Sequence, residues 1–171
     1  KIMEVNSMPD SVRFSQSHGI IPLTIDGDWN AGFSSDSFDM SKYNHCTIVM
    51  IGDTNVAGNG IITVKAGLTD AAETASVTFG YRYAGGNVSA ASSDVYDAVL
   101  TSAALTTLAT SLDLRTFIIE FDASDLNISG VQYRFVTVVV DATGSAGTVS
   151  LIAILSEPRF EKAVMWTANP A

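Results

Sequence analysis

The segment from Asp26 to Gly32 reads Asp-Gly-Asp-Trp-Asn-Ala-Gly, and it carries side-chain oxygens at alternating positions, Asp26, Asp28 and Asn30. Calcium binds oxygen ligands, and calcium loops begin with this spacing. The match is incomplete, because Ala31 stands where such loops need glycine and Ser37 stands where a bidentate Glu should close the shell. A surface turn held by Asp and Asn side chains explains the same residues without an ion. We therefore expect no metal site and keep calcium as a weak alternative.

Three acidic residues, Glu120, Asp122 and Asp125, form a second candidate group. Two carboxyl groups about 5 to 10 Å apart can act as the acid and base of a glycoside hydrolase. Glu120 and Asp122 are two positions apart in an expected strand, which places them on one face at about 6 to 7 Å. Any solvated strand face carries such acids, however, and the sequence shows no cleft. We expect no enzymatic role here.

Other catalytic groups are scarce in this sequence. His18 and His45 stand far apart, and neither has a companion at metal-ligand spacing. Cys46 adjoins an apolar segment and is best interpreted as a small buried residue instead of a nucleophile. There is no G-x-S-x-G motif and no glycine-rich phosphate loop followed by lysine. The sequence therefore predicts a protein that is not an enzyme and that uses no cofactor.

Aromatic residues suggest a further kind of site, a sugar-binding face. Trp29, Tyr81 and Tyr83 are the residues to consider, because aromatic rings stack on sugars through their apolar faces. Tyr81 and Tyr83 alternate with Val77 and Phe79, which favours a core stripe for them. A carbohydrate-binding module stays an alternative, motivated by these rings and by the Asp26 loop.

Charge and composition limit the class of partner. The 171 residues include 18 acidic and 9 basic ones, for a net charge of −9, and the basic residues do not cluster. Phosphate contacts need Lys and Arg, so nucleic acid is not expected as a partner. No apolar stretch approaches the roughly 20 residues that span a bilayer, so we expect no membrane association. The single cysteine excludes an intrachain disulfide and fits folding in a reducing cytoplasm.

Strands must position all of these residues, because alternation with a period of two is the dominant local pattern. It is clear in Ser76 to Tyr83, in Ile61 to Gly67 and in Thr116 to Asp122. Three other runs are apolar on both faces and rich in β-branched residues, as expected of central strands or of strands covered by a partner. They are Cys46 to Ile51, Phe135 to Val140 and Val149 to Leu155.

Weaker strands are expected at Val12 to Phe14, Ile20 to Thr24 and near Val95 to Leu100, for a total of about eight or nine. This number of strands, without long helical periodicity, predicts an all-β fold, a jelly-roll-like β-sandwich. Thr101 to Leu114 has leucines spaced by three and four, which fits one short helix or an irregular loop.

Both ends of the sequence depart from the alternating pattern. We expect a single sandwich domain over residues 12–160, an N-terminal arm over 1–11 and a C-terminal arm over 161–171. The arms carry apolar residues that a solvated tail would not normally display. The predicted partner-binding residues are Ile2, Met3, Met8, Arg159, Phe160, Met165 and Trp166.

The order of the motifs carries a resemblance that covers most of the chain, from about Leu23 to Phe160. Its elements are Asp39-Met40-Ser41-Lys42-Tyr43 leading into Thr47 to Ile51, then Gly60 to Ala66, Val77 to Tyr83, Ile119 to Ala123 with Leu126, and Ile154 to Phe160. This series resembles a family of small virion proteins of tailed bacteriophages. Some members of that family are capsid decoration, or cement, proteins.

The resemblance implies a jelly-roll-like domain that sits, commonly as a homotrimer, on the outer surface of the capsid and stabilises it. The partner would be the major capsid protein, and the protein would be made in the bacterial host cytoplasm and located in the virion. A tail or neck component of the virion is the alternative within the same class. The composition agrees, because only 16% of residues are charged and neutral surfaces pack closely at low desolvation cost.

Overall fold

The computed structural model describes residues 14–53, 56, 60–84, 94–107 and 112–159. Within them the chain is all-β, apart from the short helical turns α1 (Phe14–Ser17) and η1 (Ala123–Leu126) and a helical residue at Leu112. No helix of this part of the chain is long and apolar enough to cross a membrane. The strands are β1 (Gly19–Asp28), β2 (Phe33–Ser34), β3 (Phe38–Asp39), β4 (Tyr43–Gly52), β5 (Gly60–Gly67), β6 (Ala75–Ser76), β7 (Phe79–Tyr83), β8 (Leu100–Ser102), β9 (Ala104–Thr107), β10 (Thr116–Asp122), β11 (Asn127–Ile128), β12 (Val131–Gln132), β13 (Phe135–Val140) and β14 (Thr148–Pro158).

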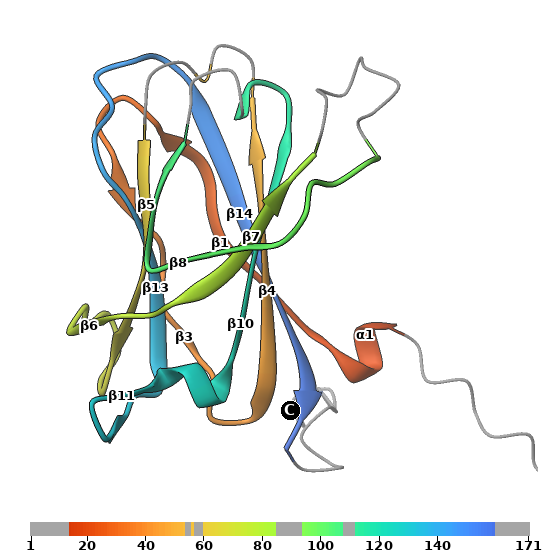
Figure 1. Cartoon of the computed structure of the whole chain (residues 1–171), viewed down its shortest axis with the longest axis vertical. Helices are drawn as coiled ribbons and strands as arrows, with labels where there is room; N and C mark the ends of the chain where they lie inside the picture. The colour runs from red at the N-terminus through yellow and green to blue at the C-terminus, as the bar shows by residue number, and fades with distance from the viewer. Residues whose placement is uncertain (1–13, 54–55, 57–59, 85–93, 108–111, 160–171) are drawn as a thin grey trace, which may run out of the picture.

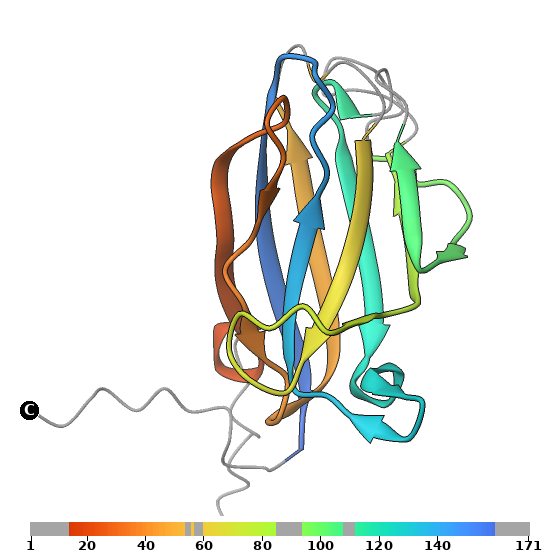
Figure 2. The same cartoon turned by 90° about the vertical axis from the view of Figure 1, so that its left-hand side faces the viewer.

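The strands form a sandwich of two antiparallel sheets. The first sheet has the order β1-β14-β4-β10-β7-β8 and the second β2-β13-β5-β6, where β3 also pairs with β13 and β9 also pairs with β5. Figures 1 and 2 show the two layers, with β13 and β5 in one and β14, β4 and β10 in the other. Strands distant in sequence thus lie side by side in both sheets, as in a jelly roll. The predicted jelly-roll-like β-sandwich is confirmed.

The core lies between the sheets and is filled by alternate residues of each strand. Met50 of β4 stands opposite Phe117 of β10 and Leu151 of β14, and all three are buried. In the second sheet Val64 of β5 faces Val138 of β13, again fully buried. Residues that pair directly across antiparallel strands share a face, so each register places a whole row of side chains in the core.

The three runs that are apolar on both faces are central, as expected. β4 and β14 have a neighbouring strand on each side, and so does β13. Ile61 to Gly67 and Thr116 to Asp122 form β5 and β10, so these predicted strands are also confirmed. Eight strands of the described residues have four or more residues, which agrees with the expected eight or nine. The others are short: β2, β3, β6 and β8 lie along the edges of the two sheets, and β11 and β12 form a separate two-stranded sheet.

The predicted strand Ser76 to Tyr83 is divided between the two sheets. β6 pairs with β5, and the backbone N–H of Val77 still donates to the carbonyl of Val64 at 2.9 Å. Two residues later the chain pairs as β7 with β10 in the opposite sheet. The predicted stripe on one face is nevertheless correct, because Val77 and Phe79 are buried and Tyr81 and Tyr83 pack against the core.

The weaker local predictions have different outcomes. The segment Thr101 to Leu114, predicted as one short helix or an irregular loop, starts in strands, because residues 100–102 and 104–107 form β8 and β9. Leu112 near its end is helical, and residues 108–111 lie outside the described part. Near Val95 to Leu100 only Leu100 belongs to a strand. Of Val12 to Phe14, only Phe14 is described, and it begins α1. The expected arms over 1–11 and 161–171 lie outside the described residues.

Phe117 packs against two other aromatic rings in the core. Its ring lies 5.7 Å from the ring of Tyr81 and 6.5 Å from that of Tyr83, centroid to centroid, and it is almost fully buried.

Phe117→Ala removes these contacts and leaves a cavity, so we expect the free energy of unfolding to fall by about 3 to 5 kcal/mol. Urea denaturation measures this loss. The control Leu68→Ala, at a side chain that is 58% exposed, should change stability by less than about 0.5 kcal/mol; equal losses in the two variants would contradict the described core.

Candidate partner-binding surfaces

The Asp26 to Asn30 motif forms a turn at the end of β1. Asp28 Oδ1 accepts hydrogen bonds from the backbone N–H groups of Asn30 at 2.9 Å and of Ala31 at 3.3 Å. Asp26 has a positive φ of 51° where the strand bends. Short polar side chains tolerate this conformation and hold such turns. The carboxylate of Asp28 thus has a structural partner, and within the described residues no group of three or more His, Cys, Asp or Glu could hold a metal ion.

The three acidic residues near the end of β10 also have partners. Glu120 lies 3.5 Å from Arg82 of β7, and Asp122 lies 2.7 Å from Nδ1 of His45. Asp125 Oδ2 accepts a hydrogen bond from the backbone N–H of Asp122 at 2.8 Å, which fixes the start of η1. As expected, Glu120 and Asp122 share the outer face of β10. Each carboxylate is used to join neighbouring elements.

Cys46 and His18 are in structural positions. Cys46 is completely buried in β4, and burial raises the pKa of its thiol far above the ordinary value, because a thiolate there would lose its hydration. This agrees with the expected small core residue. His18 stacks on the ring of Phe14, with centroids 3.9 Å apart, and its Nδ1 lies 3.0 Å from the carbonyl oxygen of Phe14. The His18 ring therefore packs on the first residue of α1.

The aromatic residues considered for sugar binding lie in or against the core. Trp29 is completely buried, and Tyr81 and Tyr83 are half-buried against Phe117. A ring that stacks on a sugar must present its face to solvent. These three residues therefore provide no such platform, and the carbohydrate-binding alternative loses the aromatic residues that motivated it.

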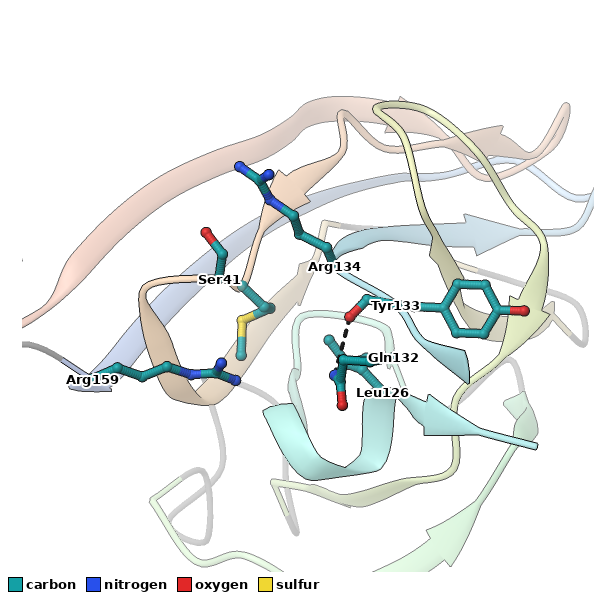
Figure 3. A pocket seen from close by; sticks show the side chains of 7 residues that line it. Ser41, Leu126, Gln132, Tyr133, Arg134 and Arg159 are labelled. Atoms are coloured by element: carbon teal, nitrogen blue, oxygen red, sulfur yellow. Dashed lines mark hydrogen bonds between the residues drawn. The ribbon is translucent and has the colours of Figure 1, made fainter. Parts of the chain in front are cut away.

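Arg159 is the one predicted partner-binding residue that the structure describes. It is exposed just beyond β14, where its backbone N–H donates to the carbonyl of Lys42 at 2.9 Å and its Nε donates to Asn44 Oδ1 at 3.0 Å. Its guanidinium borders a hollow of about 250 Å³ that Figure 3 shows from close by. The other lining residues are Met40, Ser41, Leu126, Gln132, Tyr133 and Arg134. Ile2, Met3, Met8, Phe160, Met165 and Trp166 lie outside the described residues.

A bidentate ion pair stands beside this hollow. Arg134 Nε and Nη2 donate to Asp39 Oδ1 and Oδ2 at 2.8 and 2.5 Å, and Ser41 adds backbone and hydroxyl hydrogen bonds to the same carboxylate. The hydrogen bond from Arg134 lowers the pKa of Asp39 from 3.8 to about 2, and partial burial of the carboxyl opposes this effect. The pair joins β3 to the residue before β13.

The outer face of the first sheet carries a contiguous apolar surface that the sequence analysis did not identify by residue. Pairing places Pro22, Ile152, Val49 and Ile118 in one row across four strands, and Ile20 and Ile154 in the next row. Ile20 and Ile51 are 52% and 45% exposed. We call this surface the outer patch; its members are Ile20, Pro22, Val49, Ile51, Ile118, Ile152 and Ile154. The signal in the sequence was the double-sided apolar pattern, which does not say which face is outside.

A second exposed apolar surface lies at the far edge of the same sheet. Val95, Tyr96, Val99 and Leu100 are 38 to 58% exposed, and every residue from 94 to 101 is exposed. We call these four residues the edge strip. Leu100 opens β8, the last strand of the sheet, and Tyr96 forms an isolated bridge with Ala84. Monomeric soluble proteins rarely display such clusters unless a partner covers them.

Three solved structures resemble this chain at low sequence identity. No family model matches the sequence, and no curated protein matches it. The crystal structure of the SPBc2 prophage-derived protein YomS aligns with 81% of this chain and 91% of that chain, with 9% identity and a TM-score of 0.47. The structure of infectious bursal disease virus strain Gx aligns with 82% of this chain and 42% of that chain, with 11% identity and a TM-score of 0.19. A mutant VP2 protein of the same virus covers 85% and 42%, with 14% identity and a TM-score of 0.19.

The Asp39–Arg134 pair predicts a defined dependence of stability on pH. The pKa of Asp39 is lower in the folded than in the unfolded protein, so its contribution is complete above pH 3.8 and is lost as the pH falls toward 2. Asp39→Asn removes the charge at every pH. We expect urea unfolding to show wild type more stable than Asp39→Asn near neutral pH, with a gap that closes between pH 4 and 2. The gap will be modest because both groups face solvent, and a gap that widens in acid would contradict the assignment.

Proposed function

We propose that this protein is a structural component of a tailed-phage virion, which binds the outer surface of the capsid and stabilises it. The partner is the major capsid protein, and the protein acts as a homotrimer. The proposal joins the family resemblance of the sequence to one structural observation. That observation is the edge strip, a cluster of large apolar side chains at the open edge of a rigid sandwich.

The edge strip has the properties of a docking element. Val95, Val99 and Leu100 are about half exposed within six consecutive residues, which is costly in water unless a partner removes them from it. β8 pairs only with β7, so its other edge is free of strand pairing within the described sheet. An open edge can add a strand from another protein, with apolar side chains as anchors. A capsid subunit is such a partner in the proposal.

The placement of the acidic residues supports a binding role. Glu120, Asp122 and Asp125 each join neighbouring elements of the fold, and Asp28 holds a turn. Their positions are explained by structure, and a contact protein needs no more from them. The net charge of −9 lowers non-specific association between copies. Repetition then supplies affinity, because three linked copies convert weak single contacts into strong attachment.

Binding to bare capsids tests the proposal. Purified protein is added to capsids assembled from the major capsid protein of the same phage, and both co-sedimentation and the capsid melting temperature are measured. We expect wild type to bind and to raise the melting temperature. Failure of wild type to bind, or binding without any rise, would contradict the proposal.

A substitution in the edge strip tests whether this strip makes the contact with the capsid. Leu100→Asp places a charge in the contact, so we expect binding to weaken at least about tenfold, the loss typical of an interface anchor. The matched control Leu68→Asp introduces the same charge at a side chain that is 58% exposed in the loop after β5, and it should bind like wild type. Undiminished binding by Leu100→Asp would remove the edge strip from the contact.

A further inference from the structure

The outer patch is too small to be the main contact of two globular surfaces. It spans four strands, or about 14 Å at the usual strand spacing, and three rows of side chains along the strands, again about 14 Å. The resulting area of roughly 200 Å² compares with about 800 Å² that each partner buries in a standard interface. A short apolar segment fits this size better than a rigid domain does.

The sequence after Arg159 contains such a segment. Ala163, Val164, Met165 and Trp166 are four consecutive apolar residues within the last twelve positions of the sequence. In an extended segment, Val164 and Trp166 would point to the same side about 7 Å apart. Successive rows of the outer patch, at Ile154 and Ile152, have this same spacing. Trp166 adds a large aromatic anchor of the kind that dominates interface energies.

The register of β14 decides which copy supplies the segment. β14 remains paired to β4 as far as Pro158, opposite Tyr43, and Arg159 bonds to Lys42. If the chain reversed at once with a two-residue turn, residue 162 would be level with Arg159. Val164 and Trp166 would then be level with Glu157 and Leu155.

These positions lie nearer to the C-terminal end of β14 than the outer patch does. The outer-face residues there are Ser156, His45 and Asp122, which are polar. The rows of Ile154 and Ile152 would be level with residues 167 to 169, and any longer turn would increase the mismatch. In that arrangement the apolar run of a chain would stop short of that chain's own patch, whereas the run of another copy has no such restriction.

We infer that the outer patch of each copy binds the segment 160–171 of a neighbouring copy, with Val164 and Trp166 on the rows of Ile154 and Ile152. Each copy then gives one segment and receives one. Such head-to-tail contacts form a ring when the rotation between copies closes, and a ring of three agrees with the proposed homotrimer. The inference concerns how copies hold one another, and it stands whether or not the ring binds a capsid.

Paired variants of the full chain test the exchange. The segment variant Val164→Ser/Trp166→Ser loses its anchors, and the patch variant Val49→Thr/Ile152→Thr keeps β-branched side chains but makes the patch polar. We expect light scattering to give wild type a mass of three times 18.0 kDa and each variant the mass of one chain, with association weakened at least roughly thirtyfold. The matched control Ile61→Thr makes the same kind of change on the opposite sheet and should keep the wild-type mass.

Mixing the two variants distinguishes exchange from every other arrangement. The intact segment of the patch variant can enter the intact patch of the segment variant, so the mixture should form a complex of two chains although neither variant associates alone. A wild-type protein that is monomeric, variants that keep the wild-type mass, or a mixture that stays monomeric would each overturn the inference. If Ile2→Ser/Met3→Ser lost association and the segment variant kept it, the patch would be assigned to the N-terminal segment, and the inference would again be overturned.

Trp166 fluorescence provides a reading that does not depend on mass. Subtracting the emission of Trp166→Phe from that of wild type isolates this side chain, because Trp29 is completely buried and contributes equally to both. We expect the difference spectrum to shift to the red when wild type is diluted below its association range. A blue emission that persists in a monomer would show that a chain's own segment covers its patch, and this would overturn the exchange. Capsid binding is measured separately, so failure of the exchange and failure of the proposed function are distinguishable.

Discussion

The pairing of β4 with β14 on one side and β10 on the other is the constraint on which the rest of the molecule depends. It sets Met50, Phe117 and Leu151 in one buried row. Because side chains alternate, the same register sets Val49, Ile118 and Ile152 in one outer row. A slip by one residue would exchange the two faces. Core and outer patch are therefore two results of a single register.

The ends and edges of the sandwich depend on polar contacts that this register brings within reach. Asp122 meets His45 because the two residues are opposite each other in β10 and β4. Asp39 and Arg134 connect the other sheet at the same end. The start of β1 also lies there, since Gly19 pairs with Leu155 near the end of β14. Both terminal segments of the sequence consequently join the sandwich at one end, which leaves the edge strip clear of that connection.

Much of the fold follows from the residues alone. Alternation predicted β5 and β10, and the double-sided apolar runs predicted that β4, β13 and β14 are central. The strand over residues 104–107 was not predicted because a leucine spacing does not specify its partner: Leu105 is buried as a strand residue opposite Ile62 of β5. Local spacing cannot reveal such a distant pairing, and tertiary contacts override it.

The candidate surfaces were less accessible to sequence analysis. Trp29 looked available to a ligand, yet its position beside a turn does not reveal that it is buried in the core. The outer patch was visible only as an excess of apolar residues in central strands. Which of their two faces lies outside depends on the packing of the whole sandwich. The structural roles of Asp28 and Glu120 likewise follow only from the partners that these side chains have in the folded structure.

The central claim is that this sandwich works by being held among copies of itself on a larger shell. An electron cryo-microscopy map of the virion tests it most directly, because it locates every copy. The account predicts groups of three copies over the whole capsid surface, with Val99 and Leu100 turned toward the shell. Copies confined to the tail or neck, or absent from the particle, would contradict it.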